Sequence, residues 1–207
     1  MELIKNQTIE NSSKLFLNKK EYLMLELATL ELDSKIGKDR HFIASDRKNF
    51  YRISLGLFSV IGTAIIASQA IRDILSRVEL EPSSQTLIIS IISLLVGVST
   101  AILGFLGLER QVVQHRAVGN MYIEIARRSC TLLYQADHID SDQKFDEIYK
   151  EFKTLSDKYI EANKEGDSCP TSKKDSEESF RKNEDNRKKI KEKVKQHKMR
   201  LLGLDSK

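Results

Sequence analysis

The sequence lacks the residue patterns on which most enzymes and metal centres depend. It contains two cysteines, Cys130 and Cys169, and four histidines, which are His41, His115, His138 and His197. Their spacing matches no zinc-ligand or disulfide pattern. A glycine-rich phosphate loop after a strand and a GxSxG turn are also missing. We therefore expect a protein that is not an enzyme, that binds no cofactor or metal, and whose cysteines have packing roles only.

Charged residues are missing from two stretches, although they make up 31% of the chain. Residues 53–71 and 87–108 contain no Asp, Glu, Lys or Arg. As helices, these 19 and 22 residues would reach about 28 and 33 Å, close to the ~30 Å hydrocarbon thickness of a bilayer. A core helix of a soluble protein is usually shorter and has a polar side. The two runs therefore predict a transmembrane hairpin rather than a pair of buried core helices.

Lysine and arginine are distributed unevenly around the two runs. Basic residues flank the outer ends: Lys35, Lys38, Arg40, Arg47, Lys48 and Arg52 before the first run, and Arg110, Arg116, Arg127 and Arg128 after the second. The connection, residues 72–86, has only Arg72 and Arg77. By the positive-inside rule, both termini are expected in the cytosol, and the connection becomes a short external loop with Pro82, Ser83 and Ser84 as its turn residues.

Residues 1–13 show no signal-peptide pattern, so we expect the first apolar run to direct insertion. In residues 1–52, the spacing of apolar residues predicts an amphipathic helix over 14–36, with Ser12 or Ser13 as its N-cap. Gly37 is expected to end this helix, and a basic helical lead-in follows. The expected apolar face consists of Leu15, Tyr22, Leu25, Thr29, Leu32 and Ile36.

Proline is rare enough to allow long helices after the membrane, because only Pro82 and Pro170 occur. We expect one unbroken helix over residues 87–134, whose cytosolic part presents Val118, Tyr122, Ile125 and Leu132 on one stripe. A break at 136–141 should precede a second helix that has Asp140 or Ser141 as its N-cap and ends before Gly166. Its apolar face would comprise Phe145, Ile148, Tyr149, Phe152, Leu155 and Tyr159.

The short connection between these two helices predicts an antiparallel pair within residues 109–162. The fold class expected from the sequence is an all-α membrane protein. A two-helix transmembrane hairpin would extend through long helices into a small cytosolic helical bundle.

Large apolar residues are scarce after residue 162. Residues 163–185 are mostly Lys, Glu, Asp, Ser and Asn, which predicts a disordered linker within a charged, mostly disordered basic tail, residues 163–207. Ten of the twenty residues over 181–200 are basic. Those expected to face lipid are Arg187, Lys188, Lys189, Lys191, Lys193 and Lys195. Anionic lipid headgroups are the nearest expected partner, while a solvated charged helix is the alternative. Nucleic acid is not expected, since no aromatic residue interleaves the charges after Phe180.

Small residues recur at three- and four-residue steps in both apolar runs. The second run carries Ser90, Ser93, Gly97, Thr100, Ala101, Gly104 and Gly107, and the first carries Ser59, Thr63 and Ala67. Such faces let transmembrane helices approach closely, so they serve either to hold the hairpin together or to line an oligomeric pore. The absence of ionisable residues from both runs excludes a proton relay, a voltage sensor and an ion-coupled transport site. A pore would have to be wide or gated by dewetting.

The helix leaving the second run carries Glu109-Arg110-Gln111-Val112-Val113-Gln114-His115-Arg116-Ala117, followed by Met121-Tyr122-Ile123. With the two-span layout, this stretch resembles the SLATT family, the SMODS and SLOG-associating two-transmembrane effector domain. The resemblance rests on His115, Ala117 and Tyr122 and on the layout over residues 14–160. It implies a bacterial anti-phage effector that oligomerises in the inner membrane and permeabilises it when triggered. The trigger would come from a separate signal-sensing protein or a nucleotide signal.

A protein of another class accounts for the same layout. In a non-conducting membrane anchor or scaffold, the hairpin would only localise the chain while the cytosolic bundle recruits a partner. A soluble helical protein with an unusual core is the third alternative. The partners expected are the lipid bilayer and, for a pore, further copies of the same chain.

Overall fold

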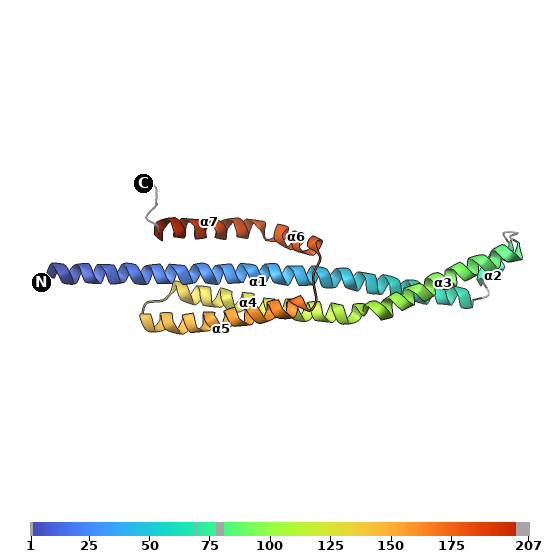
Figure 1. The fold of residues 1–207 in the computed structure, drawn as a ribbon, viewed down its shortest axis with the longest axis horizontal. Coiled ribbons are helices and arrows are strands. Elements are labelled where there is room, and N and C mark those ends of the chain that lie inside the picture. Colours follow the sequence, from blue (N-terminus) through green and yellow to red (C-terminus); the bar gives the residue numbers. More distant parts are fainter. Residues whose placement is uncertain (1, 69, 78–80, 202–207) are drawn as a thin grey trace. The chain divides into compact units, whose positions relative to one another are not determined.

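The computed structural model describes residues 2–68, 70–77 and 81–201, and 93% of it is helical (Figure 1). Its helices are α1 (Glu2–Ala67), α2 (Ala70–Arg77), α3 (Pro82–Leu106), α4 (Leu108–Asp137), α5 (Asp142–Asp167), α6 (Lys173–Lys182) and α7 (Glu184–Leu201). No strand occurs in the described ranges. The all-α prediction is therefore confirmed.

The chain divides into two compact units. The first, which we call the bundle unit, combines Met1–Ile43 with His115–Lys207, and the second, the hairpin unit, is Ala44–Gln114. The bundle unit contains the beginning of α1, most of α4, and helices α5, α6 and α7. The hairpin unit contains both apolar runs.

The core of the bundle unit is built from α1, α4 and α5. All four residues of the stripe predicted on α4 are buried, with Tyr122 only 1% exposed. From α5, Leu155 and Ala162 are buried, and partly buried aromatic residues pack around them. The stripe arises because residues three and four apart lie on one face of a helix. Side chains of α4 and α5 thus share one core with α1.

The buried face of α1 differs from the predicted one. The core residues are Leu23, Leu27 and Leu30, whereas Tyr22 is 52% exposed. Leu32 and Ile36 are buried as predicted, and the side chain of Leu15 lies outside the described residues. The difference arises because α1 is covered on a second side by α6 and α7, so no single stripe describes its contacts.

Gly37 does not end a helix, which corrects the sequence prediction. Helix α1 runs without interruption from Glu2 to Ala67, so Ser12 and Ser13 lie inside it and are not its N-cap. A Cβ at Gly37 would lie 2.9 Å from the Tyr122 ring. Burial raises the pKa of Tyr122, and its hydroxyl donates to Asn163 Oδ1 at 2.7 Å. The glycine is therefore explained by a close approach of α4 rather than by a turn.

The apolar runs are also divided differently from the prediction. Helix α1 ends at Ala67, so residues 53–71 do not form one helix. Pro82, Ser83 and Ser84 form the first turn of α3 rather than a loop turn, because proline fits the first turn of a helix, where its missing N–H is not needed. The expected unbroken helix over residues 87–134 is interrupted at Gly107, whose φ of 52° is left-handed.

Helix α5 begins as predicted and extends further than predicted. Ser141 occupies its N-cap position, and the break before it follows the end of α4 at Asp137. Gly166 lies in the last turn of α5 instead of beyond it, and the C-cap is Ser168. A Cβ at Gly166 would lie 3.2 Å from Nε2 of His41, so a larger residue there would require the imidazole to shift by a few tenths of an ångström.

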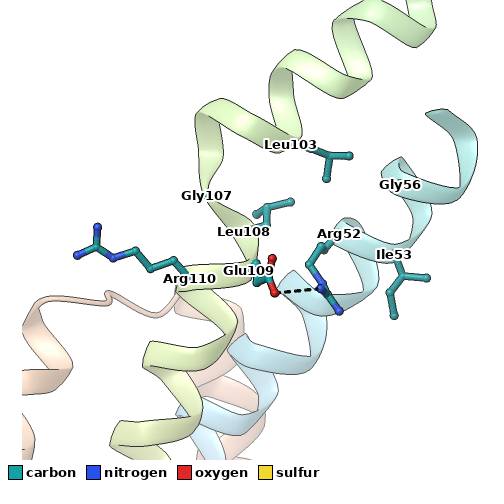
Figure 2. Close-up of a pocket in the computed structure, with 8 residues that line it drawn as sticks. All are labelled: Arg52, Ile53, Gly56, Leu103, Gly107, Leu108, Glu109 and Arg110. Atoms are coloured by element: carbon teal, nitrogen blue, oxygen red, sulfur yellow. Dashed lines mark ion pairs between the residues drawn. The ribbon is translucent and has the colours of Figure 1, made fainter. Parts of the chain in front are cut away.

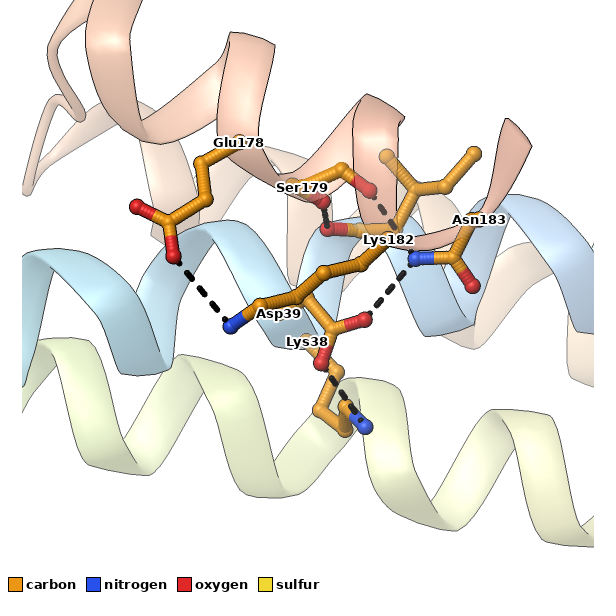
Figure 3. A network of polar contacts seen from close by, with 7 residues as sticks. Lys38, Asp39, Glu178, Ser179, Lys182 and Asn183 are labelled. Atoms are coloured by element: carbon orange, nitrogen blue, oxygen red, sulfur yellow. Dashed lines mark hydrogen bonds and ion pairs between the residues drawn. The ribbon is translucent and has the colours of Figure 1, made fainter.

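The tail predicted to be disordered over residues 163–207 is helical throughout most of the described part. Ser172 and Asp175 form a capping box that starts α6. The buried hydroxyl of Ser179 donates to the Ile36 carbonyl oxygen at 2.6 Å, and Asn183 Nδ2 donates to Asp39 Oδ2 at 2.8 Å (Figure 3). Residues 202–207 lie outside the described part. The prediction of disorder was wrong because these helices are held by polar contacts that hydrophobic patterning does not report.

Helix α7 returns along α1 in the opposite direction. Ser179 of α6 and its C-cap residue Asn183 bond to Ile36 and Asp39 of α1. Near the end of α7, Arg200 and His197 lie 2.7 and 3.3 Å from the carboxylate of Glu21, which belongs to the first part of α1. Arg187 lies over the Phe180 ring, 4.4 Å from its centroid. The basic tail is thus part of the bundle unit.

The Gly37 contact can be tested with Gly37→Ala. The added methyl group would overlap a ring that is buried and hydrogen-bonded, so we expect a loss of about 1–3 kcal/mol of stability. The measurement is thermal unfolding of the detergent-solubilised chain by circular dichroism. Gly56→Ala is the matched control, because a Cβ there meets nothing within 4 Å among the described residues. Equal melting temperatures for the two variants would contradict the assignment.

Candidate functional site: the apolar hairpin

The hairpin unit is held together by a small contact between α1 and α3. Gly62 lies directly against Val96, and any Cβ at Gly62 would overlap the Val96 side chain. Near it, Thr100 Oγ1 and Ser59 Oγ are hydrogen-bonded at 3.3 Å. Val96 and Ser99 are the buried residues of α3. A small residue facing a branched one gives the close backbone approach by which helices associate in lipid.

Most of the small-residue line lies away from this contact. Ser90, Ser93, Gly97, Ala101 and Gly104 are exposed. A Cβ at Gly97 or Gly104 would meet nothing within 4 Å among the described residues. On α1, Thr63 and Ala67 are exposed as well, whereas Ser59 is half-buried. Gly107 terminates α3. The contact between α1 and α3 within one chain therefore explains the small side chains of Ser59 and Thr100. The rest of the small-residue line is left accessible.

The apolar surface of both runs is exposed in a single chain. The large exposed side chains on α1 are Ile53, Leu57, Phe58, Val60, Ile61 and Ile65, and those on α3 are Leu87, Ile91, Leu94, Leu95, Val98, Ile102, Phe105 and Leu106. Phe105 is 91% exposed. Both helices are long and apolar enough to cross a membrane. A continuous apolar surface of this kind marks a site of contact with a membrane or another protein.

Three hydroxyl groups within the runs are bonded to their own helices. Thr63 donates to the Ser59 carbonyl at 2.7 Å, Ser93 to the Ile89 carbonyl at 2.9 Å, and Thr100 to the Val96 carbonyl at 3.0 Å. A hydroxyl that bonds to the carbonyl four residues earlier is satisfied without water. These side chains therefore meet the requirement that polar groups be satisfied internally in an apolar surrounding.

A pocket of about 810 Å³ lies where α1 and the junction of α3 and α4 meet (Figure 2). Its apolar wall contains Ile53, Leu103 and Leu108, and its charged residues are Arg52, Glu109 and Arg110. Arg52 and Glu109 form an exposed ion pair at 3.9 Å, which contributes little stability. This mixture of apolar and charged lining is typical of a membrane–water boundary.

The helix break at Gly107 leaves carbonyl oxygens without their intrahelical donors. The side chain of Gln111 supplies a donor for one of these oxygens. Its Nε2 donates to the Leu106 carbonyl oxygen at 2.6 Å, and its Oε1 accepts from Lys48 Nζ at 2.7 Å. Side-chain donors commonly satisfy the last carbonyls of a helix in this way. Lys48 and Gln111 therefore connect α1 to the start of α4 at the base of the hairpin unit.

The residues that carry the family resemblance lie in the bundle unit. His115 and Tyr122 are buried, and Ala117 is exposed. The six basic residues of the tail lie on α7, where five are exposed and Arg187 is half-buried. Lys188 donates to Glu184, which raises the pKa of that lysine. The structure thus separates three groups of predicted residues: the small-residue line, the family positions and the basic tail.

Residues that sequence reasoning missed include Gly62 and Val96, whose contact joins the hairpin. Gly62 lies three residues after Ser59 and outside the four-residue series of Ser59, Thr63 and Ala67. That series alone therefore pointed to a neighbouring face of the helix. Comparisons with protein-family models, with curated proteins and with solved structures find no match for this chain.

The hairpin contact predicts which positions cross-link within one chain. In a Cys130→Ser background, in which the remaining native cysteine, Cys169, is buried, the pair Ser59→Cys and Thr100→Cys should form an intramolecular disulfide on mild oxidation, because the native hydroxyls lie 3.3 Å apart. The readout is a mobility shift on non-reducing gels that dilution does not weaken. The control pair is Ser59→Cys with Gly97→Cys, which should not close within one chain. A closed control pair would place the small-residue line in the contact.

Proposed function

We propose that this protein is a membrane-embedded effector of a bacterial anti-phage system, which oligomerises in the inner membrane and permeabilises it when triggered. The observation that carries the proposal is the exposure of the small-residue line on α3. Gly97, Ala101 and Gly104 form a narrow face that the chain's own α1 does not cover. A second copy of α3 could approach closely along such a face.

Exposure of the large apolar side chains supports insertion in lipid. Leu94 and Phe105 are 66% and 91% exposed, and burying such a side chain contributes about 1.5–3 kcal/mol. Water is therefore an unfavourable surrounding for this surface, whereas bilayer hydrocarbon is a favourable one. With basic residues at the outer ends of both runs, the orientation we propose has both termini in the cytosol.

The permeation step would rely on assembly and wetting rather than on charge. Neither apolar run contains an ionisable side chain, and the hydroxyls of Thr63, Ser93 and Thr100 are already bonded to their own helices. An opening lined by glycine, alanine and internally bonded serine or threonine would conduct when wetted and close by dewetting. Its ion selectivity would be low, and its effect on the cell would be loss of the membrane potential.

A membrane scaffold is the second candidate function, and a groove in the bundle unit favours it. The groove has a volume of about 710 Å³ and lies where α1, α4 and α7 meet. Its charged lining includes Lys35, Lys188, Lys189 and Lys193 together with Glu31 and Glu192. Such a surface suits a charged protein segment as partner. In that case the hairpin would serve only to hold the groove at the membrane.

The test replaces Gly97, Ala101 and Gly104 together with leucine. Three large side chains would block close approach of a second α3 without touching the contact between α1 and α3 of one chain. On induction in a bacterial host, the wild-type chain should depolarise cells, as reported by a potential-sensitive dye, and the triple variant should lose at least about nine-tenths of that signal. Membrane fractionation of the same cultures shows whether the variant is still inserted.

The control variant is Val98→Leu with Ile102→Leu, which changes exposed residues of α3 outside the small-residue line. It should depolarise cells as the wild type does. If the wild-type chain reaches the membrane and never alters the potential, even with its cognate trigger, the pore proposal is wrong. A triple leucine variant that still recruits a partner captured by the wild type would then support the scaffold.

A further inference from the structure

Three residues with metal-binding side chains meet inside the bundle unit, although they lie far apart in the sequence. Nδ1 of His41 on α1 lies 3.1 Å from Nδ1 of His115 on α4. Sγ of Cys169, in the connection between α5 and α6, lies 3.9 Å from the same His41 nitrogen. Ligand atoms of all three residues fall within 4.8 Å of one another. The sequence separations of 74 and 128 residues explain why no spacing pattern reveals the cluster.

The cluster is fully enclosed by protein. His41, His115 and Cys169 are 1%, 0% and 3% exposed. Gly166 makes this possible, because the absence of a Cβ lets the last turn of α5 lie against the His41 imidazole. The Cys169 amide then donates to the Gly166 carbonyl at 3.1 Å, which fixes the backbone that carries the thiol. The Tyr122 ring, 5.8 Å from His41 between centroids, closes another side.

The donor set and its spacing match a tetrahedral zinc ion. Zinc binds imidazole nitrogen at about 2.0–2.1 Å and thiolate sulfur at about 2.3 Å. Tetrahedral angles then place two nitrogens about 3.3 Å apart and a nitrogen and a sulfur about 3.5 Å apart. The observed 3.1 and 3.9 Å lie within a few tenths of an ångström of those values. The ligand atoms of His115 and Cys169 lie within 4.8 Å of each other, so this pair would have to move closer by up to about 1.3 Å to complete the geometry.

We propose that His41, His115 and Cys169 bind one zinc ion through two imidazole nitrogens and one thiolate. Within the described residues, the cluster offers three such ligands, so the fourth tetrahedral position is left for water or another small ligand. Binding releases the thiol proton to solvent, because the thiolate is the metal ligand. The ion would link α1, α4 and the connection after α5 at one point.

This site would make the bundle unit dependent on metal. Each ligand comes from a different segment, and the unfolded chain has no such constellation, so zinc binding favours the folded bundle. The same helices, α1 and α4, continue into the hairpin unit. The proposal is independent of the pore, since a scaffold with the same bundle would bind the ion equally well. A hydrogen bond between two neutral imidazoles is the competing explanation of the short nitrogen distance.

The test measures metal in the full chain, purified in detergent with a tag that contains no histidine or cysteine. After loading with zinc and removal of excess, elemental analysis should find about one zinc per chain. Substitution with cobalt should give the visible bands of tetrahedral Co²⁺ and the charge-transfer band of a thiolate–cobalt bond. These wild-type measurements need no variant, so a folding defect cannot obscure them.

Matched variants locate the ion. Cys169→Ser and His115→Gln should weaken zinc binding at least about 100-fold, and Cys169→Ser should also abolish the thiolate charge-transfer band. Cys130→Ser and His138→Gln alter residues of the same types at exposed positions and should bind as the wild type does. A wild-type chain without stoichiometric zinc and without the thiolate band would overturn the proposal. Equal loss of zinc in Cys130→Ser and Cys169→Ser would also overturn it.

Discussion

The constraint on which the structure depends most is the need to cover the apolar surface of two helices. Along residues 53–67 of α1 and along α3, large aliphatic side chains are exposed, and the hairpin contact buries little more than Gly62, Val96 and Ser99. The hydroxyls of Thr63, Ser93 and Thr100 are bonded to carbonyl oxygens of their own helices, so they add little free polar surface to these helices. Bilayer hydrocarbon satisfies this constraint for all sides at once, and close contact between copies satisfies it for the small-residue face.

The bundle unit follows a different principle, in which an apolar core from α1, α4 and α5 is combined with close backbone approaches and buried polar contacts. Gly37, Gly119 and Gly166 each lie against an aromatic or imidazole ring: those of Tyr122, Phe42 and His41. Bonds from Ser179 and Asn183 attach α6 to α1. Such contacts need exact positions, which fits a unit that would hold a metal ion or respond to a partner.

Features with a strong local periodicity could be predicted from the sequence. Charge-free runs, the stripe through Val118 and Tyr122, and the break before Ser141 all depend on residues close together in the chain. Contacts between distant segments could not. In the sequence, Gly37 suggests a helix end, whereas the structure explains it by a close contact with Tyr122, 85 positions later. The tail looks disordered because its contact from Ser179 to Ile36 spans 143 residues and involves no apolar pair. Sequence spacing does not reveal the cluster of His41, His115 and Cys169 either, because its members also lie far apart in the chain.

The central claim is that the two apolar runs form a hairpin within the bilayer. The most direct measurement is an alkaline carbonate wash of membranes from cells that express the full chain, followed by immunoblotting of the pellet and the supernatant. An integral hairpin should remain in the pellet and be released only by detergent, as an integral marker protein is. Release of the chain into the alkaline supernatant would contradict the account, because it would show that the exposed apolar surface is covered by protein rather than by lipid.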